Sequence, residues 1–271
     1  MDPVDREALA QALSEARALV AGAASVVALT GAGISTDAGI PDFRGPQGLW
    51  TLRPGAERMS SLRHYLDDAE VRKAAWQTRL DSPVWTAQPT AGHRALVALE
   101  RQGSLHTLVT QNTDGLHQLA GSSPGRVVEV HGTAHQTVCW ECGDRRRTLD
   151  VLERVRAGED DPRCQRVLNR SGAGAEECGG ILKTATVSFG QSLDPDDLER
   201  AQLAAAGADV LIAIGTTLEV QPIAGIVPLA RRMGAAVVIV NGSPTAYDSI
   251  ADVVVRGPIS EVLPALVGEP P

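Results

Sequence analysis

Residues 25–35 read Ser-Val-Val-Ala-Leu-Thr-Gly-Ala-Gly-Ile-Ser, and this stretch decides the fold. Residues 25–30 form a short apolar run without polar alternation, which is typical of a parallel strand covered on both faces. The glycines that follow, Gly31 and Gly33, predict a tight turn into a helix whose bare backbone N–H groups bind a pyrophosphate. The pattern G-x-G-x-x-G is not met, because its third glycine falls on Thr36. Glycines that serve only the turn therefore remain an alternative.

Apolar runs of the same kind recur along the chain, with helical patterns between most of them. The runs are residues 105–110, 127–130, 209–215, 236–241 and 252–255. The helical patterns are residues 90–102, 195–206, 223–233 and 259–267, after an opening helix that begins at Asp2-Pro3 and ends at Gly22. This alternation predicts an α/β fold with a doubly wound parallel sheet, whose ligands bind outside the carboxyl ends of the strands.

Two stretches interrupt this alternation. Residues 45–89 contain Pro, Gly and Trp around a helical patch at 67–80, and residues 133–182 hold all the cysteines. We predict that these two stretches form a small domain. The large domain then consists of residues 1–44, 90–132 and 183–271.

The composition excludes several classes of protein. With 43% hydrophobic and 21% charged residues, the 271-residue chain is typical of a soluble globular protein. No apolar run approaches the roughly 20 residues of a membrane span, so we expect no membrane partner. The net charge of −8 gives no electrostatic help to binding a phosphate backbone, so we expect no nucleic acid partner. The acidic start lacks the features of a secretory signal, which predicts a cytoplasmic protein.

The four cysteines predict a metal site. In a reducing compartment, two disulfides are not expected from Cys139, Cys142, Cys164 and Cys178. A C-x-x-C pair followed by a wider pair matches a closed tetrahedral zinc site, which stabilises a fold and leaves no open position for catalysis. A redox C-x-x-C is the alternative. It is disfavoured because no strand precedes the motif and no helix begins at it.

Polar side chains follow three of the predicted strands. Residues 39–45 concentrate a carboxylate, an aromatic ring and a guanidinium, residues 111–114 supply amides and a carboxylate, and His131 follows the next strand. An Asx turn in which Asp114 caps the next helix is the alternative for the second group. Because the fold brings these strand ends to one crevice, we expect a ligand-binding site with imidazole chemistry available near neutral pH.

Taken together, these residues resemble the sirtuin family of NAD-dependent protein deacylases. The resemblance covers about residues 26–266 and rests on six ordered blocks. The blocks are residues 31–35 with 39–44, residues 110–117, residues 131–132, the four cysteines, residues 187–190, and residues 215–217 with 240–241. The resemblance implies a Rossmann-like large domain and a small domain with a helical part and a zinc part. The wide spacing from Cys164 to Cys178 is similar to that of some sirtuin branches.

The resemblance also implies the cofactors NAD and zinc and a set of site residues. NAD would be bound by Gly31, Ala32, Gly33, Ser35, Thr36, Asp42, Phe43, Arg44, Gln111, Asn112, Asp114, His131, Gly215, Thr216, Thr217, Asn241 and Gly242. An acyl-lysine protein substrate would be held as an added β-strand by Val187, Phe189, Gly190, Glu219 and Val220. The catalytic residues would be His131, as the general base, and Asn112. The inward face of an edge strand is the alternative for Val187 and Phe189.

The reaction that the resemblance implies transfers an acyl group from lysine to ADP-ribose. The acyl carbonyl oxygen attacks the ribose anomeric carbon as nicotinamide leaves, and the products are nicotinamide, O-acyl-ADP-ribose and free lysine. A mono-ADP-ribosyltransferase that uses the same NAD site is one alternative, which His131 and the strand at 187–189 disfavour. A non-enzymatic module that senses NAD or ADP-ribose is another, which Asp42, Asn112 and His131 disfavour. We expect the deacylase to be a monomer.

Overall fold

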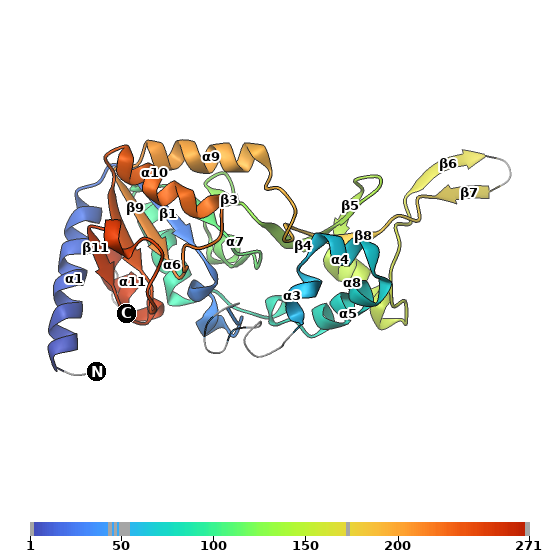
Figure 1. Ribbon diagram of the computed structural model, residues 1–271, viewed down its shortest axis with the longest axis horizontal. Helices are drawn as coiled ribbons and strands as arrows, with labels where there is room; N and C mark the ends of the chain where they lie inside the picture. The colour runs from blue at the N-terminus through green and yellow to red at the C-terminus, as the bar shows by residue number, and fades with distance from the viewer. Residues whose placement is uncertain (1–2, 43–44, 46–47, 49–54, 172–173, 269–271) are drawn as a thin grey trace.

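The structure is a computed structural model that describes residues 3–42, 45, 48, 55–171 and 174–268. Six strands form one sheet in the order β11-β10-β9-β1-β2-β3, and every neighbouring pair is parallel. Figure 1 shows helices on both faces of this sheet. The predicted doubly wound α/β fold is confirmed.

The six strands coincide with the six apolar runs, within one residue at each end. They are β1 Val26–Thr30, β2 Leu105–Thr110, β3 Val127–Glu129, β9 Val210–Ile214, β10 Ala236–Val240 and β11 Val253–Val255. The helices around them are α1 Pro3–Ala21, α6 Ala91–Arg101, α7 Leu116–Ala120, α9 Pro195–Ala206, α10 Ile226–Arg232 and α11 Ile259–Val267. We call these strands and helices the sheet region.

Both faces of the sheet are apolar. Val26 and Ala28 of β1 pack with α1, α6 and α11 in one buried cluster, whereas Val27 and Leu29 pack with α9 and α10 in another. All four side chains are 0% exposed. Burial on both faces explains why the strands are continuous apolar runs in the sequence rather than alternating ones.

The direction of strand succession reverses between β1 and β9. From β1 the chain continues to β2 and β3 on one side, whereas β9 is followed by β10 and β11 on the other. The last residues of β1 and β9, Thr30 and Ile214, are paired. The loops that follow these two strands therefore begin side by side, and such a reversal is where this fold opens a crevice for ligands.

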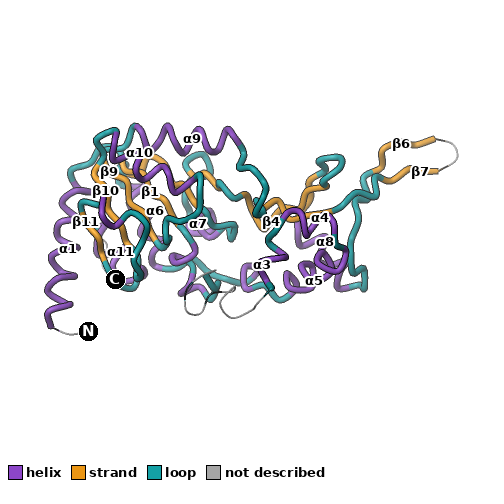
Figure 2. Tube along the Cα trace, viewed as in Figure 1, coloured by secondary structure: helices purple, strands orange, loops and turns teal. Residues whose placement is uncertain are grey.

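A second group of elements, which we call the cysteine region, lies at the other end of the molecule (Figure 2). Its helices are α3 Ala56–Met59, α4 Leu62–Asp67, α5 Ala69–Leu80 and α8 Thr148–Arg156. Its strands are β4 Gly132–Cys139, β5 Arg145–Arg147, β6 Val167–Ser171, β7 Gly174–Glu177 and β8 Leu182–Thr186. Strands β5, β4 and β8 form an antiparallel sheet in that order, and β6 and β7 form a separate projecting ribbon.

Short 3₁₀ helices complete the connections. They are η1 Ala32–Ile34, η2 Thr36–Ala38, η3 Pro83–Trp85, η4 Ile223–Gly225 and η5 Asp248–Ile250. The predicted domain boundary between residues 182 and 183 falls inside β8, which pairs with β4 of the cysteine region. Among the described residues, no helix is long and apolar enough to cross a bilayer.

Candidate functional site

A cavity of about 970 Å³ opens at the carboxyl ends of the parallel strands and extends to the cysteine region. Residues that follow five different strands contribute to its wall, because parallel strands deliver their ends to one edge. The predicted site residues that line it are Gly31, Ala32, Gly33, Asp42, Gln111, Asn112, His131, Val187, Phe189, Gly190, Gly215, Thr216, Thr217, Val220 and Asn241. A volume of this size is at the upper end of small-molecule sites and fits a dinucleotide.

Other predicted residues lie behind or beside this lining. Ser35 and Asp114 are buried behind it, where Ser35 accepts from the lining residue Asn112 and donates to Asp114. Thr36, Gly242 and Glu219 are exposed and do not line the cavity. Phe43 and Arg44 lie outside the described residues.

The loop after β1 differs from the prediction of bare backbone donors. Gly31 N–H donates to Ile214 O at 2.9 Å, and Gly33 N–H donates to Gly215 O at 2.9 Å. A Cβ on Gly33 would meet the Gly215 Cα at 2.7 Å. These glycines therefore allow the loops after β1 and β9 to touch, and both still line the cavity. The helix that follows is the short η1 and not an α-helix.

His131 is held in one tautomer by the backbone. Its Nδ1 lies 3.0 Å from the Gln111 carbonyl oxygen, which can only accept a hydrogen bond, so Nδ1 carries the proton. Nε2 is then the acceptor of the neutral ring. Burial lowers the pKa of His131 below 6.5, and the hydrogen bond to Gln111 only partly opposes this. The ring is therefore neutral at pH 7 and can accept a proton at Nε2.

Asn112 belongs to a buried polar cluster beneath the cavity. Its Nδ2 donates to Gly31 O at 3.1 Å and to Ser35 Oγ at 3.2 Å. Ser35 Oγ donates to Asp114 Oδ2 at 2.7 Å, and Asp114 Oδ1 accepts from Leu116 N–H at 2.9 Å. The Asx turn that the sequence left as an alternative for Asp114 is therefore present, although the N-cap of α7 is Gly115, and the second oxygen of Asp114 accepts from Ser35.

The opposite wall of the cavity comes from the loops after β9 and β10. Gln111 Nε2 donates to Thr216 Oγ1 at 3.0 Å, which joins the loop after β2 to the loop after β9. Asn241 Nδ2 donates to Ser243 O at 2.8 Å. Thr216 and Asn241 are each 9% exposed. These side chains are fixed before any ligand binds.

The segment after β8 connects the site to the cysteine region. Val187 N–H donates to His131 O at 2.8 Å, and Phe189 N–H donates to Ser60 O at 2.8 Å. Leu62 N–H donates to Phe189 O at 3.0 Å. The backbone amides of Val187 and Phe189 are thus already used within the chain. The Phe189 side chain is 48% exposed and lines the cavity.

The cysteine region supplies part of the cavity wall, and Trp85 and Thr184 in this wall were not expected from the sequence. Arg79 of α5, Trp85 of η3 and Thr184 of β8 line it. Arg79 Nη2 donates to Thr184 Oγ1 at 3.1 Å, and its guanidinium carbon lies 5.4 Å from the centre of the Trp76 ring. No local motif marks Trp85 or Thr184, and the contact between Arg79 and Thr184 forms only when α5 and β8 come together in the fold.

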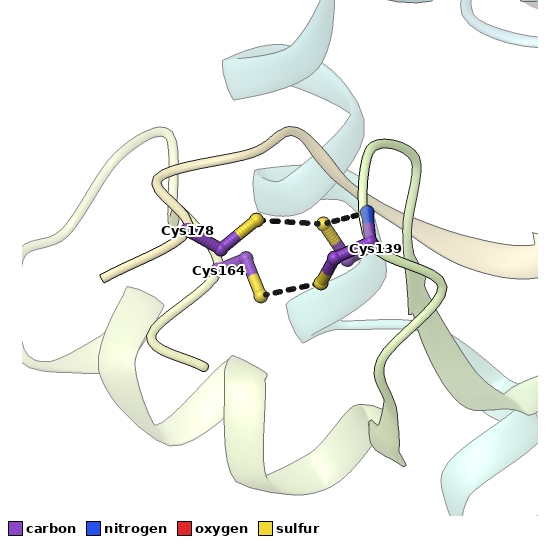
Figure 3. A group of neighbouring side chains, drawn as sticks. Cys139, Cys164 and Cys178 are labelled. Atoms are coloured by element: carbon purple, nitrogen blue, oxygen red, sulfur yellow. Dashed lines mark hydrogen bonds between the residues drawn. The ribbon is translucent and has the colours of Figure 1, made fainter. Parts of the chain in front are cut away.

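The four cysteines converge as predicted, although the expectation that no strand precedes the C-x-x-C motif was wrong, because β4 ends at Cys139. Cys139, Cys142, Cys164 and Cys178 offer Sγ atoms that all lie within 4.8 Å of one another (Figure 3). The Sγ atoms of Cys139 and Cys178 are 3.7 Å apart, as are those of Cys142 and Cys164. A tetrahedral ion with Zn–S bonds of roughly 2.3 Å requires S–S distances of about 3.8 Å. Burial raises the pKa of the Cys139 and Cys164 thiols, so their thiolates need a cation. The site fits zinc.

Comparison with known proteins assigns most of the chain to one family. The model of the Sir2 family matches residues 31–222. NAD-dependent protein deacetylase 2 of Streptomyces coelicolor is 49% identical over 242 residues, which cover 89% of this chain and 96% of that protein. NAD-dependent protein deacetylase 1 of Pyrobaculum aerophilum is 40% identical over 255 residues, which cover 94% and 93%.

Solved structures agree with the sequence relatives. A chain described under "Structural Basis for the Mechanism and Regulation of Sir2 Enzymes" has a TM-score of 0.83 and 33% identity, and the match covers 95% of this chain and 97% of that one. A Sir2 chain with a deacetylated p53 peptide and 3'-O-acetyl ADP ribose has a TM-score of 0.84 and 29% identity, with 94% and 97% covered. This chain therefore belongs to the Sir2 family, which confirms the resemblance to sirtuins that its sequence indicates.

Proposed function

We propose that this protein is an NAD-dependent protein-lysine deacetylase or deacylase, with His131 as general base and Asn112 as second catalytic residue. The observation that carries the proposal is the neutral His131 in the cavity wall, with Nδ1 bound to Gln111 O and backbone oxygen bound to Val187. The base is thereby fixed between the strand ends that would bind NAD and the segment that would bind the acylated peptide. The names of the relatives support the same activity.

Bound NAD supplies the ADP-ribosyl group that accepts the acyl group. His131 accepts a proton from a ribose hydroxyl at Nε2, and the Gln111 carbonyl stabilises the imidazolium that results. Asn112 lines the cavity and is oriented by Gly31 and Ser35, which accept from its amide nitrogen, so the amide oxygen is the atom that it would offer to NAD. Asp42 would hold the nicotinamide carboxamide, and Thr216 and Asn241 the adenosine end.

The substrate strand would add on the side of Ser188. Because the amides of Val187 and Phe189 bond to His131 and Ser60, the backbone of Ser188 faces the other way along this extended segment. Ser188 N–H donates to Gln191 Oε1 at 3.2 Å. An incoming peptide carbonyl would replace this side-chain acceptor, with Val220 on the opposite side of the peptide.

The first test is mass spectrometry of the products formed from NAD and an acetyl-lysine peptide by the zinc-loaded full chain. We expect deacetylated peptide, nicotinamide and O-acetyl-ADP-ribose in equal amounts, and loss of all three in His131→Asn, which still binds NAD. A protein that gains ADP-ribose while the peptide stays acetylated would establish the transferase alternative instead. NAD left intact with acetyl and with longer acyl peptides would leave only the sensing module.

The division into domains, the location in the cell, the oligomeric state and the zinc content belong to the same proposal. The large domain of residues 1–44, 90–132 and 183–271 would bind NAD, and residues 45–89 and 133–182 would form the small zinc-bearing domain. The chain would act as a monomer in the cytoplasm. The reducing conditions there keep the four cysteines available for zinc. Gel filtration with light scattering checks the monomer, and one zinc per chain by elemental analysis checks the metal.

A further inference from the structure

Two buried histidines, His93 of α6 and His117 of α7, lie beneath the candidate NAD site and have no role in the proposed chemistry. They are 0% and 1% exposed, and their ring centres are 4.7 Å apart. Burial lowers the pKa of His93 to about 4 and that of His117 well below 6.5. Both rings are therefore neutral at pH 7, and each has one donor and one acceptor nitrogen.

The tautomer of His93 is set by the start of its own helix. The backbone N–H of Thr90 donates to His93 Nδ1 at 3.2 Å, and the Thr90 hydroxyl oxygen lies 2.8 Å from the same nitrogen and 3.0 Å from Ile34 O. Because a backbone N–H can only donate, Nδ1 is the acceptor and Nε2 carries the proton, so the Thr90 hydroxyl turns its proton to Nδ1. Thr90 in turn caps α6, because its Oγ1 accepts from the backbone N–H of His93. The capping box of α6 therefore leaves His93 with a single free donor, at Nε2.

That donor faces Ser35. His93 Nε2 lies 3.5 Å from Ser35 Oγ, which must accept because Nε2 carries the proton. The Ser35 hydroxyl then points its own proton at Asp114 Oδ2, 2.7 Å away. The same Oγ accepts from Asn112 Nδ2. A chain of hydrogen bonds, in which each group donates to the next, thus runs from His93 through Ser35 to Asp114.

A second chain of hydrogen bonds begins at His117. Its Nε2 lies 2.9 Å from Thr30 Oγ1, which donates to Thr110 Oγ1 at 2.8 Å. Thr110 Oγ1 also accepts from the backbone N–H of Asn112 at 3.0 Å. Asn112 therefore donates into both hydrogen-bond chains, to Ser35 from its side chain and to Thr110 from its backbone.

We propose that His93 is a positioning residue for NAD binding, acting through Ser35 on Asn112 and Asp114. Its Nε2–H prevents the Ser35 hydroxyl from donating elsewhere, so Asp114 and the Asn112 amide keep the orientation that the cofactor meets. This inference rests on the proposed function, because it assumes that NAD occupies the cavity that Asn112 lines. A merely structural His93 would matter only for capping α6.

Two substitutions separate these roles, because each retains one of the two nitrogen functions of the ring. In His93→Asn, the amide oxygen near the former Nδ1 still accepts from Thr90, whereas no donor reaches Ser35. In His93→Gln, the amide nitrogen near the former Nε2 still donates to Ser35, whereas the contact with Thr90 is lost. We expect the Kd for NAD to rise about fivefold in His93→Asn and to stay near the wild-type value in His93→Gln. We expect the larger fall in Tm in His93→Gln.

The measurement is calorimetric titration of NAD into the zinc-loaded full chain, with Tm measured in parallel. A rise in Kd that follows the fall in Tm, largest in His93→Gln, would overturn the proposal, as would an unchanged Kd in both variants. Ser122→Ala is the matched control, because the buried Ser122 hydroxyl has no partner among the described residues and its removal should leave the Kd unchanged. In a Ser35→Ala background His93→Asn should add nothing further, which repeats the test from the acceptor side.

This design separates two kinds of failure. The Kd does not depend on deacylation, so a chain that binds NAD without consuming it still tests His93. A wild-type chain that does not bind NAD would contradict the proposed function itself.

Discussion

The sheet region and the cysteine region are stabilised in different ways. The parallel strands are buried on both faces in two extensive apolar clusters, and the interiors of β1, β9 and β10 are 0% exposed. The cysteine region has a small cluster around Trp76 and Leu152 that includes two of the cysteines, Cys139 and Cys164. The difference teaches that hydrophobic burial alone can stabilise the sheet region, whereas the cysteine region also requires ion pairs and a bound zinc ion.

Removal of the metal should give the largest effect, and only in the cysteine region. Structural zinc sites contribute on the order of 10 kcal/mol of folding free energy. We therefore expect Cys142→Ser, or a strong chelator, to unfold the cysteine region while the sheet region keeps its protection from hydrogen exchange. Hydrogen exchange read by mass spectrometry, with elemental analysis for zinc, measures both regions in one sample.

If the zinc-free chain loses protection from hydrogen exchange equally in β1 and in β4, the two regions are not stabilised in different ways. Glu199→Gln, at an exposed position of α9 that does not line the cavity, is the control for handling and should leave exchange unchanged in both regions.

Substitution of the base His131 should lower catalytic turnover and leave the stability of both regions unchanged. His131→Asn removes proton acceptance at Nε2, and general base catalysis is worth about 10²–10⁴-fold in rate. We expect kcat for deacylation to fall by this factor while zinc content and Tm stay near wild type. Retention of full turnover in steady-state assays would remove the base assignment.

A buried ion pair should give the next effect, again confined to the cysteine region. Arg72 of α5 is 5% exposed and binds Asp161 through Nε and Nη2 at 2.9–3.1 Å, while Nη1 donates to Leu66 O at 2.9 Å. Removing one partner of such a pair costs about 3–5 kcal/mol, because the other charge stays buried and unpaired. We expect urea unfolding to show this loss for Asp161→Asn.

The reciprocal variant sharpens this prediction. In Arg72→Met the remaining carboxylate keeps Arg163, whose Nη2 lies 2.8 Å away, so the loss should be smaller than in Asp161→Asn. Arg231→Met removes an exposed partner of Asp252 in the sheet region and should cost less than about 1 kcal/mol. Equal losses for all three variants would mean that the two regions do not differ in their use of charge.

The same difference explains what the sequence could predict. The strands of the sheet region were found within one residue because burial on both faces leaves a local signal, the continuous apolar run. The strand ends then located His131 and Asn112, since parallel strands share one edge. The contact between Arg79 and Thr184 left no local signal, because the two residues are far apart in sequence and meet only through tertiary packing. The hydrogen bonding of Gly31 and Gly33 depended likewise on the loop after β9.

The smallest expected effect concerns pH and lies within the sheet region. His131 must be neutral to accept a proton, and burial lowers its pKa below 6.5 in the folded chain. The acid limb of kcat/KM should therefore lie below pH 6.5, so a fall in pH from 8 to 6.5 should change the rate by less than about twofold. In the cysteine region, burial lowers the pKa of Lys183 of β8 to about 7, but this side chain does not line the cavity. We therefore expect the acid limb to follow His131, and Arg72→Met should leave it in place. A pH–rate profile with an acid limb above 6.5 would mean that His131 is more hydrated than the structure shows, or that another group is the base.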